Sequence, residues 1–241
     1  VRVFNAIAIN RPLIENMVRR LQNGSYPKSV VPIVWKDSKQ GSSCMIMPML
    51  ADVDEDKLTI AIRSLQDRLD NYPEADAWPV VEKLARALGE MHQRKIAHGN
   101  LKPGNIFFNQ DDSLCLTDFA MGLMPGVSML PFTDALLYAP PEQLREPDGY
   151  LEGKGYAWDN YAFAVIAFRL LTGKFPRCEA TFHQVAPEPG ERHVTGIEAD
   201  LIKMAERLEH RELEGWSGEA SDAMERKRRA IIHKCLSLDP E

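Results

Sequence analysis

The sequence predicts an α+β protein, in which a short strand-rich part precedes a longer helical part. The first 50 residues contain apolar runs of strand character, whereas after Ala51 apolar residues recur mainly at helical spacing. A small strand-rich lobe followed by a larger helical lobe is an α+β arrangement. We therefore expect one lobe over residues 1–50 and another over residues 51–241, which meet near Pro48–Asp52.

Three strands and one helix are expected in the first 50 residues. Val1–Phe4 has the pattern of a short strand, and apolar residues recur at helical spacing from Leu13 to Leu21. The pair Asn23-Gly24 is typical of a helix end. Two further strands are predicted over Val30–Trp35 and Ser43–Met49.

The remainder of the chain is expected to be mainly helical. Amphipathic periodicity predicts helices over Lys57–Leu69 and Trp78–Gln93. Tyr161–Leu171 is apolar on nearly every side, which predicts a buried helix. Short strands are predicted between these helices over Ile96–His98, Ile106–Phe108 and Leu114–Thr117.

Charge and composition argue against some partners and locations. The net charge of −6 argues against nucleic acid or an acidic membrane surface, because both favour clustered Lys and Arg. No apolar stretch reaches the roughly 18 residues that a bilayer span needs. The four cysteines lie far apart, which predicts free thiols in the cytoplasm and gives no support for a zinc site: Cys44, Cys115, Cys178 and Cys235.

Five short motifs follow one another in an order typical of a single family. His98–Asn105 reads His-Gly-Asn-Leu-Lys-Pro-Gly-Asn, and residues 118–120 read Asp-Phe-Ala. Glu142 ends an Ala-Pro-Pro-Glu segment, Asp159 opens the apolar helix, and Cys235–Pro240 lies near the last residue. In this order and spacing they resemble the catalytic loop, Asp-Phe-Gly, Ala-Pro-Glu, anchoring Asp and closing helix of eukaryotic-type Ser/Thr protein kinases.

The resemblance implies a two-lobed protein kinase-like fold, with residues 1–50 as a partial, β-rich N-lobe and residues 51–241 as the larger, mostly helical C-lobe. It also implies roles for the loop residues. Lys102 would contact the transferred phosphate, and Asn105 and Asp118 would hold Mg²⁺. Asn100 stands where the family has its catalytic Asp.

Other positions correspond to the adenine pocket and to structural residues of the family. Met47 corresponds to the gatekeeper and Pro48–Leu50 to the hinge, where the N–H of Leu50 would meet adenine. Phe107 corresponds to the residue beneath adenine, which is usually a smaller aliphatic. Four residues correspond to structural positions: His98 and Phe119 in the internal hydrophobic spine, and Glu142 and Asp159 in the C-lobe.

The departures from the family predict a loss of catalysis. Asn100 carries an amide, which cannot accept the proton of a substrate hydroxyl, and Gly99 replaces the arginine that pairs with a phosphorylated loop. Phe4 falls about where the nucleotide-gripping lysine would lie. These changes predict a pseudokinase, a protein-binding or allosteric signalling module with weak or no binding of ATP and Mg²⁺. Its partner would be an active kinase or another signalling protein.

Two other functions remain open from the sequence. One is a weakly active Ser/Thr protein kinase that uses Lys102 and the metal residues without a carboxylate base, since a loose transition state requires little of that base. The other is a small-molecule kinase of the aminoglycoside or choline type, whose loop Gly99 fits better. Glu142 and Asp159, with its buried helix, argue against the second.

Overall fold

The computed structural model describes residues 2–5, 11–37, 42–54, 56–69, 77–119, 134–177, 206, 213–216 and 218–238. Ala120 and Cys178 lie outside these ranges, and no side chain before Glu15 or between residues 35 and 45 is described, so that of Phe4 is not. The chain divides into two compact units. One comprises residues 1–73 with 82–127, and the other residues 74–81 with 128–241.

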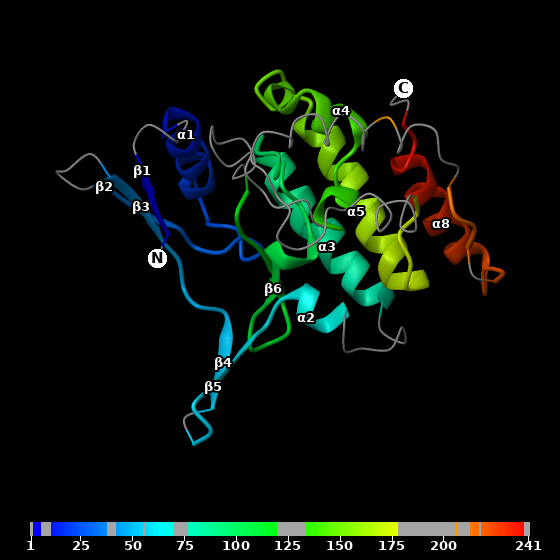
Figure 1. Cartoon of the computed structure of the whole chain (residues 1–241), viewed down its shortest axis with the longest axis horizontal. Helices are drawn as coiled ribbons and strands as arrows, with labels where there is room; N and C mark the ends of the chain where they lie inside the picture. The colour runs from blue at the N-terminus through cyan, green and yellow to red at the C-terminus, as the bar shows by residue number, and fades with distance from the viewer. Residues whose placement is uncertain are drawn as a thin grey trace, which may run out of the picture. The chain divides into compact units, whose positions relative to one another are not determined.

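The first unit begins with a small antiparallel sheet (Figure 1). Its strands are β1 (Arg2–Asn5), β2 (Val34–Asp37) and β3 (Ser42–Ile46), in the order β1-β3-β2. Phe4 on β1 lies opposite Ser43 on β3. The predicted first and third strands are confirmed, whereas the run from Val30 becomes a regular strand only at Val34. Val30 instead forms an isolated bridge with Leu116.

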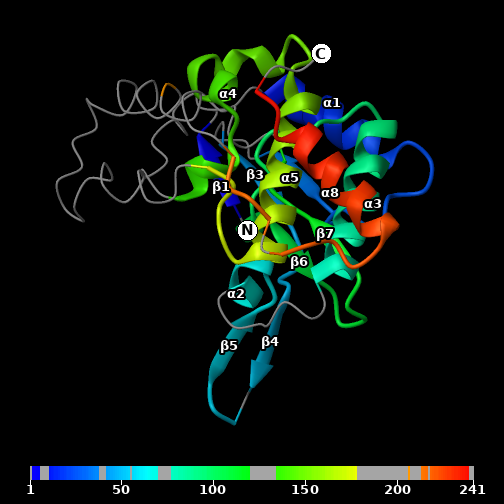
Figure 2. The ribbon, with the colours of Figure 1, turned by 90° about the vertical axis from the view of Figure 1, so that its right-hand side faces the viewer.

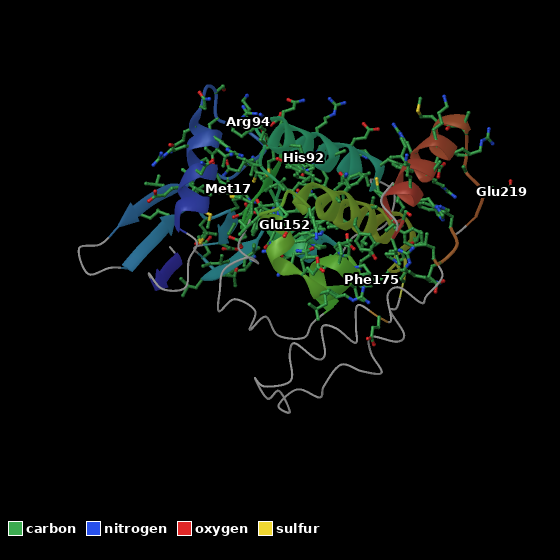
Figure 3. The ribbon with its side chains drawn as sticks, turned by 90° about the horizontal axis from the view of Figure 1, so that it is seen from above. Met17, His92, Arg94, Glu152, Phe175 and Glu219 are labelled. Carbon is green, nitrogen blue, oxygen red and sulfur yellow. The ribbon has the colours of Figure 1, made fainter. Side chains whose placement is uncertain are left out.

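Helix α1 (Arg11–Gln22) confirms the helix predicted after β1. Met17, Val18 and Leu21 are buried along one face, and Gly24 takes a positive φ of 82° just after the helix. Figure 3 shows Met17 on this helix and Arg94 just beyond the end of α3 (Ala77–Gln93). Arg94 Nη2 donates to the carbonyl oxygen of Ser25 at 2.8 Å, which fixes the segment that follows α1.

The segment from Ala51 to Leu69 differs from the prediction. A helix was expected over Lys57–Leu69, but the chain forms β4 (Ala51–Asp54), β5 (Thr59–Ile62) and a short helix α2 (Leu65–Leu69). Alternation of apolar and polar side chains favours the hairpin, and Asp54 Oδ1 accepts from the N–H of Lys57 across its turn. Ser64 Oγ accepts from the N–H of Asp67, which starts the helix at Leu65.

The two short strands predicted after residues 98–105 are confirmed. Strands β6 (Ile106–Phe108) and β7 (Leu114–Leu116) pair antiparallel. The predicted strand over Ile96–His98 is wrong, because these residues form no ladder and the N–H of Ile96 donates to Met91 at the end of α3.

Asp112 in the β6–β7 turn links three elements of the first unit. Its Oδ1 lies 2.7 Å from Arg68 Nη1 on α2, and its Oδ2 lies 2.8 Å from Lys83 Nζ on α3. The hydrogen bond from Lys83 and then the contact with Arg68 hold the pKa of Asp112 below its ordinary value. The ionised carboxylate therefore stabilises the folded state.

We expect Asp112→Asn to lower the free energy of unfolding by about 0.5–1 kcal/mol at neutral pH, because this carboxylate is half exposed and partly screened. The folded pKa lies below the unfolded one, so the stabilisation is present above the unfolded pKa and lost as pH falls through the folded pKa. Urea titrations of both proteins from neutral to acidic pH check this. A difference that persists unchanged in acid would contradict it.

The second unit is built around α5 (Gly155–Thr172), shown with its neighbours in Figure 2. This element confirms and extends the predicted buried helix, and its middle turns, Ala164 to Ala167, are inaccessible to solvent. Helix α8 (Ala223–Cys235) packs against α5, and Arg177 Nη1 donates to the carbonyl oxygen of Leu236 at 2.7 Å. The shorter elements are η5 (Asp134–Tyr138), α4 (Pro141–Arg145) and η6 (Pro147–Tyr150). Among the described residues no helix has the length and hydropathy of a membrane span.

Candidate active-site loop

The loop from His98 to Asn105 is shaped by one glycine and one proline. Gly99 has a φ of 67°, a left-handed conformation that glycine adopts without the steric cost that a side chain adds. Pro103 opens a 3-10 turn (η3, Pro103–Asn105), in which the N–H of Asn105 donates to the carbonyl oxygen of Lys102 at 2.9 Å. Buried Leu101 anchors the loop between these two points.

His98 joins this loop to the segment that follows β7. Its side chain is fully buried, and Nε2 lies 3.0 Å from the carbonyl oxygen of Thr117. The N–H of Asn100 donates to Nδ1 at 3.3 Å, so Nδ1 is unprotonated and Nε2 carries the proton. Both ring nitrogens are engaged by the main chain, so this side chain has a structural position.

Asn100, Asn105 and Asp118 are joined by hydrogen bonds. Asn105 Nδ2 donates to the carbonyl oxygen of Asn100 at 2.7 Å, and Asn100 Nδ2 donates to the carbonyl oxygen of Asp118 at 3.3 Å. The carbonyl oxygen of Asn105 accepts from the N–H of Thr117. The amide at position 100 thus serves as a donor in a position where a carboxylate could only accept.

Asp118 is held in a left-handed turn with a φ of 59°. Its side chain is buried, and Thr117 Oγ1 lies 3.4 Å from its Oδ1. The same hydroxyl lies 3.4 Å from the sulfur of Met47, so this residue, the predicted gatekeeper, lies beside the turn. Phe119 is buried directly after it. A non-glycine residue held at positive φ is uncommon and is often found at functional sites.

Asn105 and Asp118 have the donor chemistry that Mg²⁺ prefers. Asn105 uses Nδ2 toward Asn100, and its side-chain oxygen remains a possible cation ligand. Mg²⁺ typically binds one or two protein carboxylates together with substrate phosphates, so a larger acidic cluster is unnecessary. The described residues contain no group of three or more His, Cys, Asp or Glu placed to hold a metal. The residues therefore fit a Mg²⁺ ion shared with phosphate oxygens. Lys102 is half-buried directly before η3, and its predicted contact with the transferred phosphate stays a prediction.

The predicted hinge residues Pro48 and Leu50 line an open groove of about 770 Å³. Val31 and Cys115 also line it, whereas Met47 and the loop residues predicted to contact phosphate and metal are not part of its described lining. Burial raises the pKa of Cys115 to about 11, so the thiol stays protonated at neutral pH. The predicted nucleotide site therefore stays a prediction.

Phe107 and Phe108 point to opposite sides of β6. Phe108 is fully buried, and the guanidinium carbon of Arg68 lies 3.5 Å from its ring centroid. Phe107 is only partly buried, and its main chain pairs with Cys115 and forms a bridge with Ser64. Its predicted position beneath adenine stays a prediction.

Two predicted structural residues lie in the second unit. Asp159 is fully buried on α5, and Glu142 is partly buried in the first turn of α4. The resemblance to protein kinases also implies hydrogen bonds from Asp159 to the main chain near His98 and Gly99, and this stays a prediction.

Three residues that make long-range contacts in the fold were not predicted from the sequence. Thr117 connects His98, Met47 and Asp118, and its position directly before Asp118 was the available signal. Arg68 joins Phe108 to Asp112, and buried Arg177 fixes the end of α8, but both contacts span the fold and leave no local pattern.

Comparison with solved structures places the fold in the kinase class. The chain superimposes on the structure of the Cydia pomonella granulovirus kinase PK-1 with a TM-score of 0.60, covering 98% of this chain and 77% of that one. Sequence identity over this likeness is 17%, so it supports the fold. Together with the loop geometry, it defines a two-lobed protein kinase-like domain.

A family model described as protein kinase domain matches residues 27–241, and the chain belongs to this family. It is 34% identical over 128 residues to the serine/threonine-protein kinase PknF of Mycobacterium tuberculosis, covering 49% of this chain and 26% of PknF. It is 28% identical over 176 residues to the calcium/calmodulin-dependent protein kinase cmkA of Emericella nidulans, covering 69% of this chain and 39% of cmkA. The chain therefore spans well under half the length of these relatives.

Proposed function

We propose that this chain is a pseudokinase, a kinase-like domain that acts by binding a protein partner in place of transferring phosphate. The observation that carries the proposal is the amide at position 100. An asparagine side chain cannot accept a proton, and proton transfer by a positioned base is typically worth about 10²–10⁴ in rate. Asn100 also donates to the carbonyl oxygen of Asp118, so its nitrogen is directed into the turn.

The residues at the predicted nucleotide site favour weak binding of ATP or none. By the resemblance, Glu15 would pair with the nucleotide-gripping lysine, but its Oε2 lies 3.8 Å from Nη2 of Arg19 on the same helix. Phe4 falls about where that lysine would lie. Loss of a charge-assisted phosphate contact weakens binding by about 1.5–3 kcal/mol. Mg²⁺, when bound with phosphates, would neutralise their charge, and Asn105 and Asp118 would hold it. We therefore include weak or no ATP–Mg²⁺ binding in the proposal.

The partner proposed is a protein, an active kinase or another signalling component, and the location proposed is the cytoplasm. The net charge of −6 argues against nucleic acid. Cys115 and Cys235 are free thiols, which accords with a reducing compartment.

A weakly active Ser/Thr protein kinase is the second candidate. One observation favours it, since Asn105 and Asp118 are brought together in one hydrogen-bonded network through Asn100. Membership of the protein kinase family argues against the small-molecule kinase.

A titration with ATP, with and without Mg²⁺, followed by a phosphotransfer assay on the same sample tests the proposal. We expect millimolar ATP–Mg²⁺ to raise the melting temperature by less than about 1 °C, since stabilisation by a ligand grows only when its concentration exceeds Kd. We expect no phosphate transfer above background. Transfer by the unmodified chain that Asp118→Ala abolishes would establish the second candidate.

Asn100→Asp is expected to leave phosphotransfer at background, because residues that act as a unit do not restore activity singly. The variant should also unfold more easily by about 1 kcal/mol, since a carboxylate cannot donate to the carbonyl oxygen of Asp118. Asn100→Ala is the matched control, which removes the donor without adding charge. Robust activity in Asn100→Asp would show that the other departures matter little.

A further inference from the structure

The β4–β5 hairpin has one apolar face and one polar face. Ala51 lies opposite Ile62, and Val53 lies opposite Ile60, so these four side chains share one face of the hairpin. The opposite face carries the pairs Asp52 with Ala61 and Asp54 with Thr59. The hairpin therefore has the pattern of a sheet that is covered on one side.

The apolar face is nevertheless open to solvent. Val53, Ile60 and Ile62 are 56%, 60% and 56% exposed. Figures 1 and 2 show the hairpin extending away from α2, with no other described element of the first unit beside its tip. An isolated two-stranded hairpin is at best marginally stable in water, and exposed apolar patches on proteins mark interaction sites.

Among the described strands, only β4 pairs with β5, so no described strand pairs along the outer edge of Thr59–Ile62. Thr59–Ile62 contains no charge, proline or glycine, whereas such residues usually protect an edge strand from pairing. The N–H of Arg63 donates to the carbonyl oxygen of Leu50, which makes this a hydrogen-bonded pair. Because such pairs alternate along an antiparallel ladder, the main-chain groups of Ile60 and Ile62 point away from β4. They are placed to accept another strand.

The negative charge of the hairpin favours a basic strand as the partner of β5. Residues 51–62 carry four acidic side chains and one lysine, a net charge of −3. Asp54 pairs with Lys57 at 3.0 Å on the exposed surface, and exposed Asp52 lies 3.7 Å from Arg63, whose side chain is mostly buried. A second copy of this chain would bring two acidic hairpins together, whereas a basic strand would be attracted.

We propose that the β5 edge and the apolar face beside it bind an extended segment of a partner protein, with apolar side chains at alternate positions and Lys or Arg at its ends. Main-chain hydrogen bonds to Ile60 and Ile62 would align the segment, and its apolar side chains would cover Val53, Ile60 and Ile62. This inference deepens the proposed function, because it names the surface through which the domain would bind its protein partner.

The test uses the whole chain and a fluorescein-labelled peptide of sequence KKVTVRVTVKK, with EEVTVEVTVEE as the charge-reversed control. The protein is titrated into a fixed, low concentration of labelled peptide, and fluorescence anisotropy then measures Kd values up to about 1 mM. Amide exchange measured by NMR reports the N–H groups of Ile60 and Ile62. We expect the basic peptide to bind, to slow exchange at both amides, and to bind at least about tenfold more tightly than the acidic peptide at low salt.

Two variants test the contributions of the β5 edge and of the apolar face to peptide binding, and a third is the control. Ile60→Pro removes an outward N–H without removing a bond to β4, and the triple variant Val53→Thr, Ile60→Thr and Ile62→Thr keeps β-branched shapes while removing the apolar face. Each should weaken binding at least about tenfold, whereas Ala61→Thr on the opposite face should change it less than about twofold. Unchanged thermal unfolding of the four proteins would show that the body of the domain is intact.

Several outcomes would overturn the proposal. These are no binding of the basic peptide, equal binding of the acidic peptide, or binding that survives Ile60→Pro. Sedimentation that shows a dimer, dispersed by Ile60→Pro, would assign the surface to a second copy. The phosphotransfer assay tests the pseudokinase proposal separately, so an active chain that binds the peptide through β5 would reject that proposal and keep this surface.

Discussion

Trp158→Ala should lower the free energy of unfolding of the second unit by about 3–5 kcal/mol, the range for removal of a large buried aromatic side chain. Trp158 lies on α5 with only 1% of its surface exposed, and its ring centroid is 6.4 Å from that of Tyr150. Removal leaves a cavity that the surrounding helices cannot fill completely. Urea denaturation monitored by circular dichroism measures the loss.

Trp158→Phe is the matched control. Trp158 Nε1 is buried and finds no hydrogen-bond acceptor in the described part of the chain, so phenylalanine removes a donor without breaking a bond. We expect this variant to cost less than half as much as Trp158→Ala. Equal losses in the two variants would show that the indole N–H has a partner in solution.

His98→Leu should destabilise the first unit by about 2–4 kcal/mol, because it leaves the carbonyl oxygen of Thr117 and the N–H of Asn100 without the partners they have in the native fold. Leucine has a similar size, so the effect measures hydrogen bonding more than volume. Chemical denaturation gives the free energy. Amide exchange should also become faster across residues 98–105.

Thr117→Val tests whether the main chain or the hydroxyl of Thr117 carries this effect. It removes Oγ1, whose contacts with Asp118 and Met47 are both 3.4 Å, and keeps the carbonyl oxygen that meets His98. We expect a loss below about 1 kcal/mol. A loss as large as that of His98→Leu would assign the stabilisation to the hydroxyl.

Local sequence patterns predicted the regular elements well where apolar spacing was clear. The periodicity that marks α1, α3 and α5 is strong, and these helices agree with their expected positions. The Lys57–Leu69 prediction failed because Leu58, Ile62 and Leu65 also satisfy a helical spacing. Two other patterns indicated the hairpin and the short helix instead. Apolar and polar residues alternate in the strands between Ala51 and Ile62, and Ser64 caps a helix with Asp67 three residues later.

The candidate site was predicted from motif order, and its internal bonds were not. Spacing placed Asn100, Asn105 and Asp118 in one loop system, and the hydrogen bonds join them. The directions of the hydrogen bonds among these residues depend on left-handed turns at Gly99 and Asp118. In a sequence, only the glycine indicates such a turn. The link from His98 to Thr117 spans 19 residues, beyond the range of any local pattern.

The bond between the N–H of Arg63 and the carbonyl oxygen of Leu50 closes the base of the hairpin, so the chain leaves the body of the domain and returns to it at one place. Lengthening such a loop is inexpensive, since each doubling of its length costs only about 0.6 kcal/mol in closure entropy. Residues 51–62 can therefore diverge in length and sequence while the remainder of the domain stays unchanged. In protein engineering, the same closed base offers a permissive insertion point for a reporter or a grafted epitope.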